Sequence, residues 1–132
     1  MEDFYEFMKE RILQMERRSS NCIGASLYIT GEIPSESYFS KEDAKLKFSR
    51  LKNSPKPDLG YIVLWASDGI PFHAGVISSV KPTRIVHRNE INGLLTEHAL
   101  EELINRIYKN THLKPVYKIP SQLKDIKDNP QI

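Results

Sequence analysis

The sequence predicts an α+β domain, with helices first and an antiparallel meander of strands after them. Apolar residues recur at spacings of three and four before residue 53 and again after residue 95, which is typical of amphipathic helices. Between these regions, two short runs rich in β-branched and aromatic residues, 59–66 and 71–79, flank a Ser-Asp-Gly turn. Helices that are separated in sequence from a block of hairpin-linked strands indicate the α+β class.

Three helices are expected in the first part of the chain. Residues 2–17 predict an amphipathic helix, because apolar side chains recur there every three or four positions: Phe4, Phe7, Met8, Ile12 and Met15. A short helix follows from Cys22, after three residues that are good N-caps, and we expect Gly31 to end it. After a loop, Ser40 caps a third helix, which we expect to end near Asn53.

The second half of the chain predicts strands, one more helix and a tail. The expected elements are strands at 59–66, 71–79, 84–87 and 116–119, the last at an edge of the sheet, and a helix at 95–108. Proline at position 120 stops the final strand, and the residues after it are polar and aperiodic. We therefore expect a single domain over 1–120 and a frayed polar tail over 121–132.

The composition is that of one ordinary globular domain. The chain has 132 residues, 39% hydrophobic and 27% charged, and this length can bury a core without disulfides or structural metal. The net charge of +2 comes from lysines and arginines interspersed with acids, so nucleic acid is not an expected partner. One cysteine and four scattered histidines fit no zinc spacing, and we expect neither a metal nor an organic cofactor. The oligomeric state is not indicated by the sequence.

The start of the chain bears on its location. The first fifteen residues carry acids and no apolar core, so they predict neither a Sec signal peptide nor a membrane span. We therefore expect a cytoplasmic protein, or one that is exported by a route that needs no Sec signal.

Cys22 is the candidate nucleophile. It is expected in the first turn of a helix, where unpaired backbone N–H groups and the positive helix end stabilise a thiolate. Thiols in such places have pKa values as much as several units below the free value of about 8.5. The alternative is that Cys22 is a small buried hydrophobic residue, as most lone cysteines are.

Two histidines are candidates to serve such a thiolate. His73 shares one face of its expected strand with Gly75, and the glycine leaves open space beside the imidazole for a helix N-terminus. Antiparallel pairing across a tight turn brings His87 beside His73. Each histidine alone also fits a structural role, half-buried for His73 and at an exposed strand end for His87. The other two, His98 in the first turn of the late helix and His112 after its end, are expected to be solvated.

These pieces together resemble the NlpC/P60 family of papain-like cysteine peptidases. That family has D-C-S-G at a helix start, a P-G-D-L-type strand, an H-V-G-I-Y strand and a strand with an I-H-A-type histidine. The corresponding segments here occur in the same order: N-C-I-G at 21–24, P-D-L-G-Y-I-V-L-W at 57–65, H-A-G-V-I at 73–77 and I-V-H-R at 85–88. The resemblance covers roughly residues 20–87. It implies a papain-like fold in which N-terminal helices lie on a small antiparallel sheet.

The resemblance also implies a chemistry. Cys22 is then the nucleophile, His73 the general base and acid, and His87 the residue that orients His73. The reaction is hydrolysis of a peptide or amide bond, as in peptidoglycan-type peptides, through an acyl-enzyme and without a cofactor. Asn21 and Ile23 stand where the murein-cleaving members have an acid and a serine, so these positions are expected to contact substrate with altered specificity.

Two other functions fit the same residues. An acyltransferase would use the same triad, although relatives specialised for lipid acyl transfer usually place the histidine before the cysteine. A catalytically inactive papain-like module would bind a partner through its exposed lysines or its N-terminal apolar stripe, with Cys22 merely buried.

Overall fold

The computed structural model describes residues 2–15, 20–89 and 93–123, and these form the predicted α+β domain with an antiparallel sheet, which has six strands where the sequence predicts four. The helices are α1 (Glu2–Gln14), α2 (Cys22–Ile29), α3 (Lys41–Ser49) and α4 (Leu100–Thr111). The strands are β1 (Lys52–Ser54), β2 (Ile62–Ser67), β3 (Ile70–Val80), β4 (Thr83–Arg88), β5 (Leu95–Ala99) and β6 (Val116–Ile119). Their order across the sheet is β1-β6-β2-β3-β4-β5.

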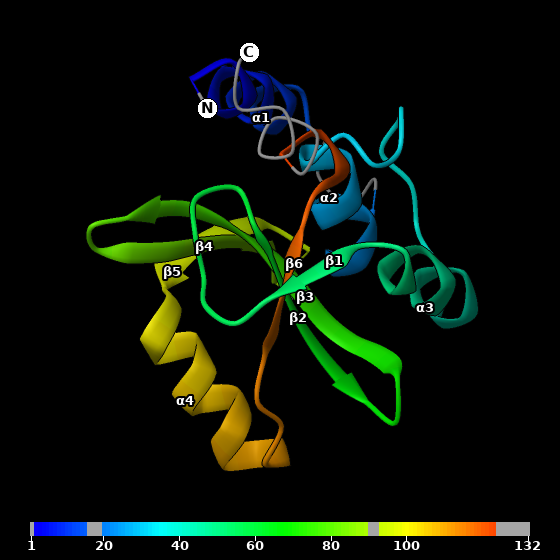
Figure 1. The fold of residues 1–132 in the computed structure, drawn as a ribbon, viewed down its shortest axis with the longest axis vertical. Coiled ribbons are helices and arrows are strands. Elements are labelled where there is room, and N and C mark those ends of the chain that lie inside the picture. The colour runs from blue at the N-terminus through cyan, green and yellow to red at the C-terminus, as the bar shows by residue number, and fades with distance from the viewer. Residues whose placement is uncertain (1, 16–19, 90–92, 124–132) are drawn as a thin grey trace.

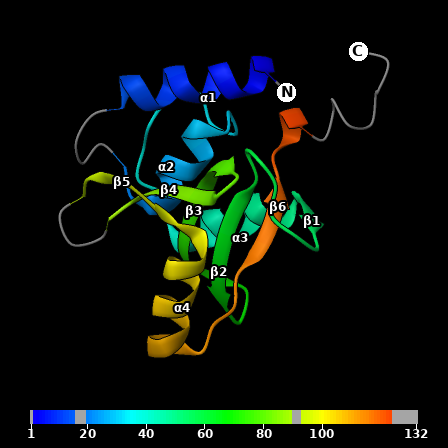
Figure 2. The same cartoon turned by 90° about the vertical axis from the view of Figure 1, so that its left-hand side faces the viewer.

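The helices cover the sheet from different sides (Figures 1 and 2). In Figure 1, α1 and α2 lie at one end, α3 lies on the right and α4 at lower left, while Figure 2 shows α4 in front of the sheet and α3 behind it. A first apolar core joins α1 and α4 to the strands, and Trp65, Ile77 and Ile85 are fully buried in it. A second core lies between α2, α3 and the β2–β3 pair. The central strand β3 is therefore covered by helices on both faces.

Helix α2 has the ends that the sequence predicts. The side chain of Asn21 accepts a hydrogen bond from the backbone N–H of Gly24 at 2.8 Å, which is the N-cap interaction. At the other end Gly31 has a φ of +82°, and the amide of Glu32 donates back to the carbonyl of Leu27 at 2.8 Å. Each of the eight residues of α2 is buried, so the helix belongs to the core.

Helix α3 begins as predicted but ends earlier. Ser40 caps it by accepting from the amide of Asp43 at 3.1 Å, and the last helical residue is Ser49 instead of one near Asn53. Residues 52–54 form β1, which pairs with β6. This pairing overturns a second expectation, because β6 lies between β1 and β2 and is not an edge strand. The polar side chains of β1 carry no strand signal, and the backbone of β6 determines its conformation.

The prediction of a helix over 95–108 is wrong for its first five residues, 95–99. Residues 95–99 form β5, paired with β4, and α4 starts only at Leu100. The apolar positions that supported the helix, such as Leu103 and Ile107, all lie after this point. Across the β4–β5 pair the Arg84 guanidinium contacts the Glu97 carboxylate at 2.8 Å, which supports the register.

The ends of the chain also depart from expectation. Residues 121–123 are not a free tail, because the amide of Ser121 donates to a carboxylate oxygen of Glu32 at 2.7 Å and Leu123 is fully buried. The rest of the predicted tail, 124–132, lies outside the described residues, as do 16 and 17 of the first predicted helix. Among the helices that the structure describes, none has the length and apolar character that crossing a membrane requires.

Candidate active site

Cys22 is the first residue of α2, where the sequence predicts it. Cys22 is 7% exposed, and it belongs to the same apolar cluster as Ala74, the residue after His73 on β3. Helix α2 packs along β3, so the cysteine and the histidine strand are brought together by the second core. Cys22 therefore lies at the positive end of α2, in the first helical turn.

The two residues beside the cysteine have structural roles instead of the expected substrate contacts. The Asn21 side-chain oxygen accepts from the amides of Gly24 and Phe39, and its amide nitrogen donates to the carbonyl of Phe39 at 2.9 Å. Asn21 therefore joins the start of α2 to the loop before α3. Ile23 is 4% exposed and lies in the second core, so its side chain does not face a substrate.

Gly24 allows the same loop to lie directly on the helix. A Cβ atom at this position would lie 1.8 Å from the carbonyl oxygen of Ser37, a distance that no side chain can accommodate. The glycine of the N-C-I-G segment is therefore required by the close approach of the loop over 32–39. This loop and the start of α2 form one tightly joined unit beside the cysteine.

His73 and His87 form the predicted imidazole pair. His73 Nε2 lies 2.8 Å from His87 Nδ1, and the two rings meet edge to face with their centroids 4.8 Å apart. Both residues are buried, at 5% and 3% exposure. Val76 of β3 pairs with Val86 of β4, and continuing this register places His87 diagonally across from His73.

The space above Gly75 is not the opening that the sequence suggested. A Cβ atom there would come within 2.5 Å of the Ile85 side chain, which already occupies the space. The glycine therefore makes room for an isoleucine of the neighbouring strand and not for a helix N-terminus. The ring of Trp65, on the opposite neighbour β2, is tilted against His73 with its centroid 5.7 Å away.

The environment of His87 keeps its imidazole neutral. The pKa of His87 is lowered from 6.5 to about 3, mainly by burial and additionally by the nearby His73, His98 and Arg106. A neutral imidazole can accept a hydrogen bond at one nitrogen while it carries its proton on the other. When His73 donates from Nε2, His87 accepts at Nδ1 and holds its proton on Nε2. That Nε2 atom is buried without a hydrogen-bond partner among the described residues.

His98 is placed differently from the prediction, and His112 as predicted. His98 lies on β5 instead of in the first turn of α4, and its ring centroid is 5.1 Å from that of His87. Its Nε2 atom is also buried and without a partner in the described part of the chain. The sequence Leu95 to Ala99 has no apolar–polar alternation that could have placed His98 on a strand, so its position follows from the pairing of β5 with β4. His112 is exposed after the end of α4.

A buried ion pair that sequence reasoning missed stands next to these groups. Arg88, 3% exposed, forms an ion pair with Glu36 and donates from Nε to the Ser20 hydroxyl at 2.9 Å. Ser20 in turn donates to Glu36 at 2.9 Å, and Arg88 Nη1 donates to the carbonyl of Gly93 at 2.7 Å. This network, the Ser20–Glu36–Arg88 cluster, joins the approach to α2, the loop after it and the end of β4. An arginine directly after a predicted catalytic histidine, within a buried strand, is the signal that could have found it.

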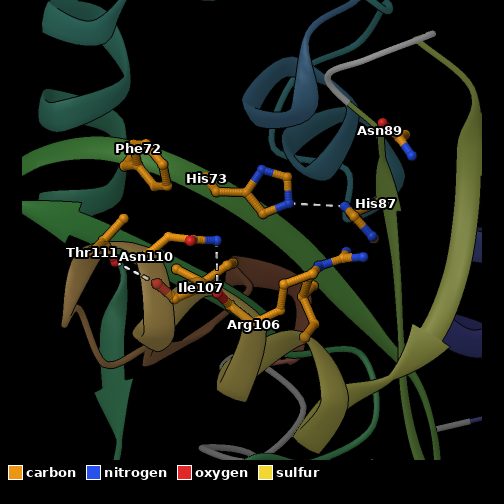
Figure 3. A pocket seen from close by; sticks show the side chains of 9 residues that line it. Phe72, His73, His87, Asn89, Arg106, Ile107, Asn110 and Thr111 are labelled. Atoms are coloured by element: carbon orange, nitrogen blue, oxygen red, sulfur yellow. Dashed lines mark hydrogen bonds between the residues drawn. The ribbon is translucent and has the colours of Figure 1, made fainter.

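A pocket of about 340 Å³ lies between the two imidazoles and helix α4. Figure 3 shows His73 and His87 on one wall and the side chains of α4 on the opposite wall, with Arg106 extending toward His87. Helix α4 contributes to the first core and the start of α2, with Cys22, to the second core. The pocket walls are apolar at Phe72, Leu103 and Ile107 and polar at Arg106, Asn89 and Asn110.

The arrangement is a buried imidazole pair on two strands that pack against the helix whose first residue is the cysteine. Within residues 2–15, 20–89 and 93–123, no group of three or more His, Cys, Asp or Glu side chains is placed to hold a metal ion. Comparisons of the chain with models of protein families, with curated proteins and with solved structures found no match.

Proposed function

We propose that this protein is a cysteine hydrolase that cleaves a peptide or amide bond through Cys22, His73 and His87, on a papain-like fold of the NlpC/P60 type. The observation that carries the proposal is the buried contact of 2.8 Å between His73 Nε2 and His87 Nδ1. A structural histidine pair needs no particular neighbour, but this pair lies on strands that pack against the helix whose first residue is the only cysteine of the chain. The motif order described above supports the same conclusion.

The two histidines then have different tasks. His87 stays neutral because its pKa is lowered to about 3, so its Nδ1 accepts a hydrogen bond from His73 Nε2–H and fixes the orientation of that ring. In the proposed mechanism the Nδ1 atom of His73, which is not the atom that contacts His87, takes the proton of the Cys22 thiol. Transfer of the thiol proton to Nδ1 gives a thiolate and an imidazolium whose two N–H groups face a thiolate and a neutral imidazole.

The reaction follows from these roles. The Cys22 thiolate attacks the amide carbonyl carbon, forming a C–S bond, and the oxyanion is met by the backbone N–H of Cys22, a contribution of about 3 kcal/mol for such a donor. His73 gives its Nδ1 proton to the leaving nitrogen as the C–N bond breaks. Water then attacks the thioester carbonyl, and His73 takes a proton from that water. The C–S bond breaks, the carboxylic acid is released, and the proton returns from His73 to the Cys22 sulfur, so the thiol is regenerated.

The substrate class is an amide of the peptide or peptidoglycan-fragment type. In the murein-cleaving members of the family, the residue before the cysteine is an acid, and it helps to hold a substrate amine. Here that residue is Asn21, a neutral side chain that is engaged in the helix cap and in the contact with Phe39. Recognition of a free N-terminal amine at this position is therefore not part of the proposal.

The test is a screen of peptide and muropeptide amides by mass spectrometry, with the wild type and Cys22→Ala. We expect the wild type to give two fragments whose summed mass exceeds the substrate by one water, and we expect the variant to give none. A thioester adduct trapped on Cys22 with an activated ester would mark the acyl-enzyme. Turnover that is equal in the wild type and the folded Cys22→Ala variant would refute the triad, and transfer of the acyl group to an added amine without hydrolysis would identify an acyltransferase instead.

A further inference from the structure

One face of α4 is turned to the histidine pair. The helical residues that line the pocket recur at spacings of three and four, as one helix face does: Leu103, Arg106, Ile107, Asn110 and Thr111. The other side chains of this face are apolar or neutral, as expected for a pocket wall beside an apolar core. Arg106 is the exception, because it is an exposed residue that places a permanent positive charge beside the apolar and amide groups of the pocket.

The guanidinium of Arg106 has no acceptor within the part of the chain that the structure describes. Its side chain forms no hydrogen bond and no ion pair there, although Glu102 lies one helical turn before it. The charge nevertheless acts on the pocket, since Arg106 is one of the groups that lower the pKa of His87. Figure 3 shows the side chain extending from α4 toward that ring.

The chemistry of such a cation indicates its ligand. A guanidinium offers five N–H donors in a planar fork that matches the two oxygens of a carboxylate. Arg106 is exposed in the free protein, so a ligand that covers it against the apolar walls removes water from the charged pair and strengthens the attraction. Phe72, Leu103 and Ile107 supply those walls, and a volume of about 340 Å³ suits one or two amino-acid residues.

We propose that this pocket is a substrate subsite for a carboxylate, bound by Arg106, next to the bond that the histidine pair serves. The proposal rests on the proposed function and names its substrate class: an amide with an aliphatic body and a carboxylate within about one residue of the scissile bond. The carboxylate comes either from an acidic side chain or from a free C-terminus, and both present the same two oxygens to the guanidinium.

Equilibrium binding tests the subsite without any turnover. Cys22→Ala protein is titrated by NMR with two pairs of probes, N-acetyl-Ala-Glu-amide against N-acetyl-Ala-Gln-amide, and N-acetyl-Ala-Leu with a free carboxylate against its amide. We expect one carboxylate probe to bind about tenfold more tightly than its uncharged twin. If the glutamate pair shows the difference, the ligand is a side-chain carboxylate, and if the leucine pair shows it, the ligand is a chain terminus.

Two variants assign the effect to its residue. Arg106→Gln, made in the Cys22→Ala background, is expected to abolish the preference for the carboxylate, and Arg106→Lys to keep only part of it because a lysine cannot bind both oxygens in the same plane. Arg50→Gln removes the same charge from an exposed arginine at the end of α3, on the opposite face of the sheet, and should change nothing.

The outcomes separate the subsite from the catalytic proposal. Equal binding of both members of each pair, a preference that survives Arg106→Gln, or no binding of any probe at roughly millimolar concentration would each overturn the subsite. A preference that depends on Arg106, in a protein whose wild type hydrolyses no amide, would leave the subsite standing and refute the proposed function. Hydrolysis that shows no dependence on a carboxylate would refute the subsite and leave the proposed function standing.

Discussion

The two sides of the histidine pair are built in opposite ways. On the α2 side, Asn21 uses both ends of its side-chain amide, the Ser20–Glu36–Arg88 cluster is closed by hydrogen bonds, and Cys22 is buried. On the α4 side there is an open pocket of about 340 Å³, whose arginine has no acceptor among the described residues. The same two imidazoles, 2.8 Å apart, form the boundary between these regions.

This difference separates two tasks that an enzyme site must perform. A nucleophile and its base need fixed positions, because an error of an ångström in their geometry costs large factors in rate. A substrate subsite needs an open cavity and a polar group whose partner arrives with the ligand. We therefore expect substitutions on the α2 side to act on kcat and on stability, and substitutions on the α4 side to act on KM.

The largest effect is expected for the imidazole at the boundary. His73→Asn removes the base while keeping a polar side chain, and kcat should fall by at least about a thousandfold. The matched control is His112→Asn, because His112 is exposed after α4 at a φ of +61°, a backbone conformation that asparagine tolerates. Steady-state kinetics on the best substrate measures both variants. Comparable losses in the two would mean that His73 has no special role.

The next effect concerns the α2 side, called the closed side because hydrogen bonds close its polar groups. Glu36→Gln leaves Arg88 buried without its anion, and we expect the free energy of unfolding to fall by about 3 kcal/mol. Glu97→Gln breaks a similar pair with Arg84, but that pair is roughly half-exposed, so its loss should cost less than about 1 kcal/mol. Urea unfolding compares the two. If both variants lose the same stability, the Ser20–Glu36–Arg88 cluster does not hold the closed side together.

A third prediction concerns pH. The pKa of His87 is about 3 in the folded protein and near 6.5 when unfolded, so the unfolded chain binds one more proton between these values. Stability should therefore fall as pH is lowered through this range, with His87 contributing up to about 1.4 kcal/mol per pH unit. Urea unfolding between pH 7 and pH 4 measures the slope. A His87→Gln variant should show a smaller slope, and an unchanged slope would contradict the neutral, buried imidazole.

The smallest effect belongs to the open side. Arg106→Gln should raise KM for a carboxylate-bearing substrate by about tenfold while kcat changes little, because the contact is made in the ground state and in the transition state alike. The free energy of unfolding should stay within about 0.5 kcal/mol of the wild type, as for other exposed positions. A variant that lost kcat and kept its KM would place Arg106 in the chemistry and would remove the contrast between the two sides.

The parts of this account that the sequence predicts depend on local signals. Asn21 and Gly31 mark the ends of α2 through capping and turn chemistry that operates within a few residues. His73 and His87 are brought together by a hairpin, so the tight turn between their strands was enough to expect the contact. The prediction therefore succeeds wherever neighbours in sequence determine the structure.

The parts that it misses depend on partners far along the chain. The strand β1 has polar side chains, and only its pairing with β6 makes it a strand. The residues of β5 were assigned to α4 because the apolar spacing that follows them is helical, while their own conformation comes from β4. Glu36 and Arg88 are 52 positions apart, and no local pattern connects them. Arg106 resembles any surface residue of a helix until α4 is placed against the histidines.

The central claim is that Cys22 and His73 form an ion pair, and alkylation of Cys22 by iodoacetamide as a function of pH tests it most directly. Because the chain has one cysteine, the rate reports this thiol alone. We predict rapid alkylation of the native protein at about pH 6, with an apparent pKa well below the ordinary value of about 8.5, and a shift toward that value in His73→Asn. A wild-type profile that follows a single ionisation near 8.5, unchanged by the substitution, would contradict the account.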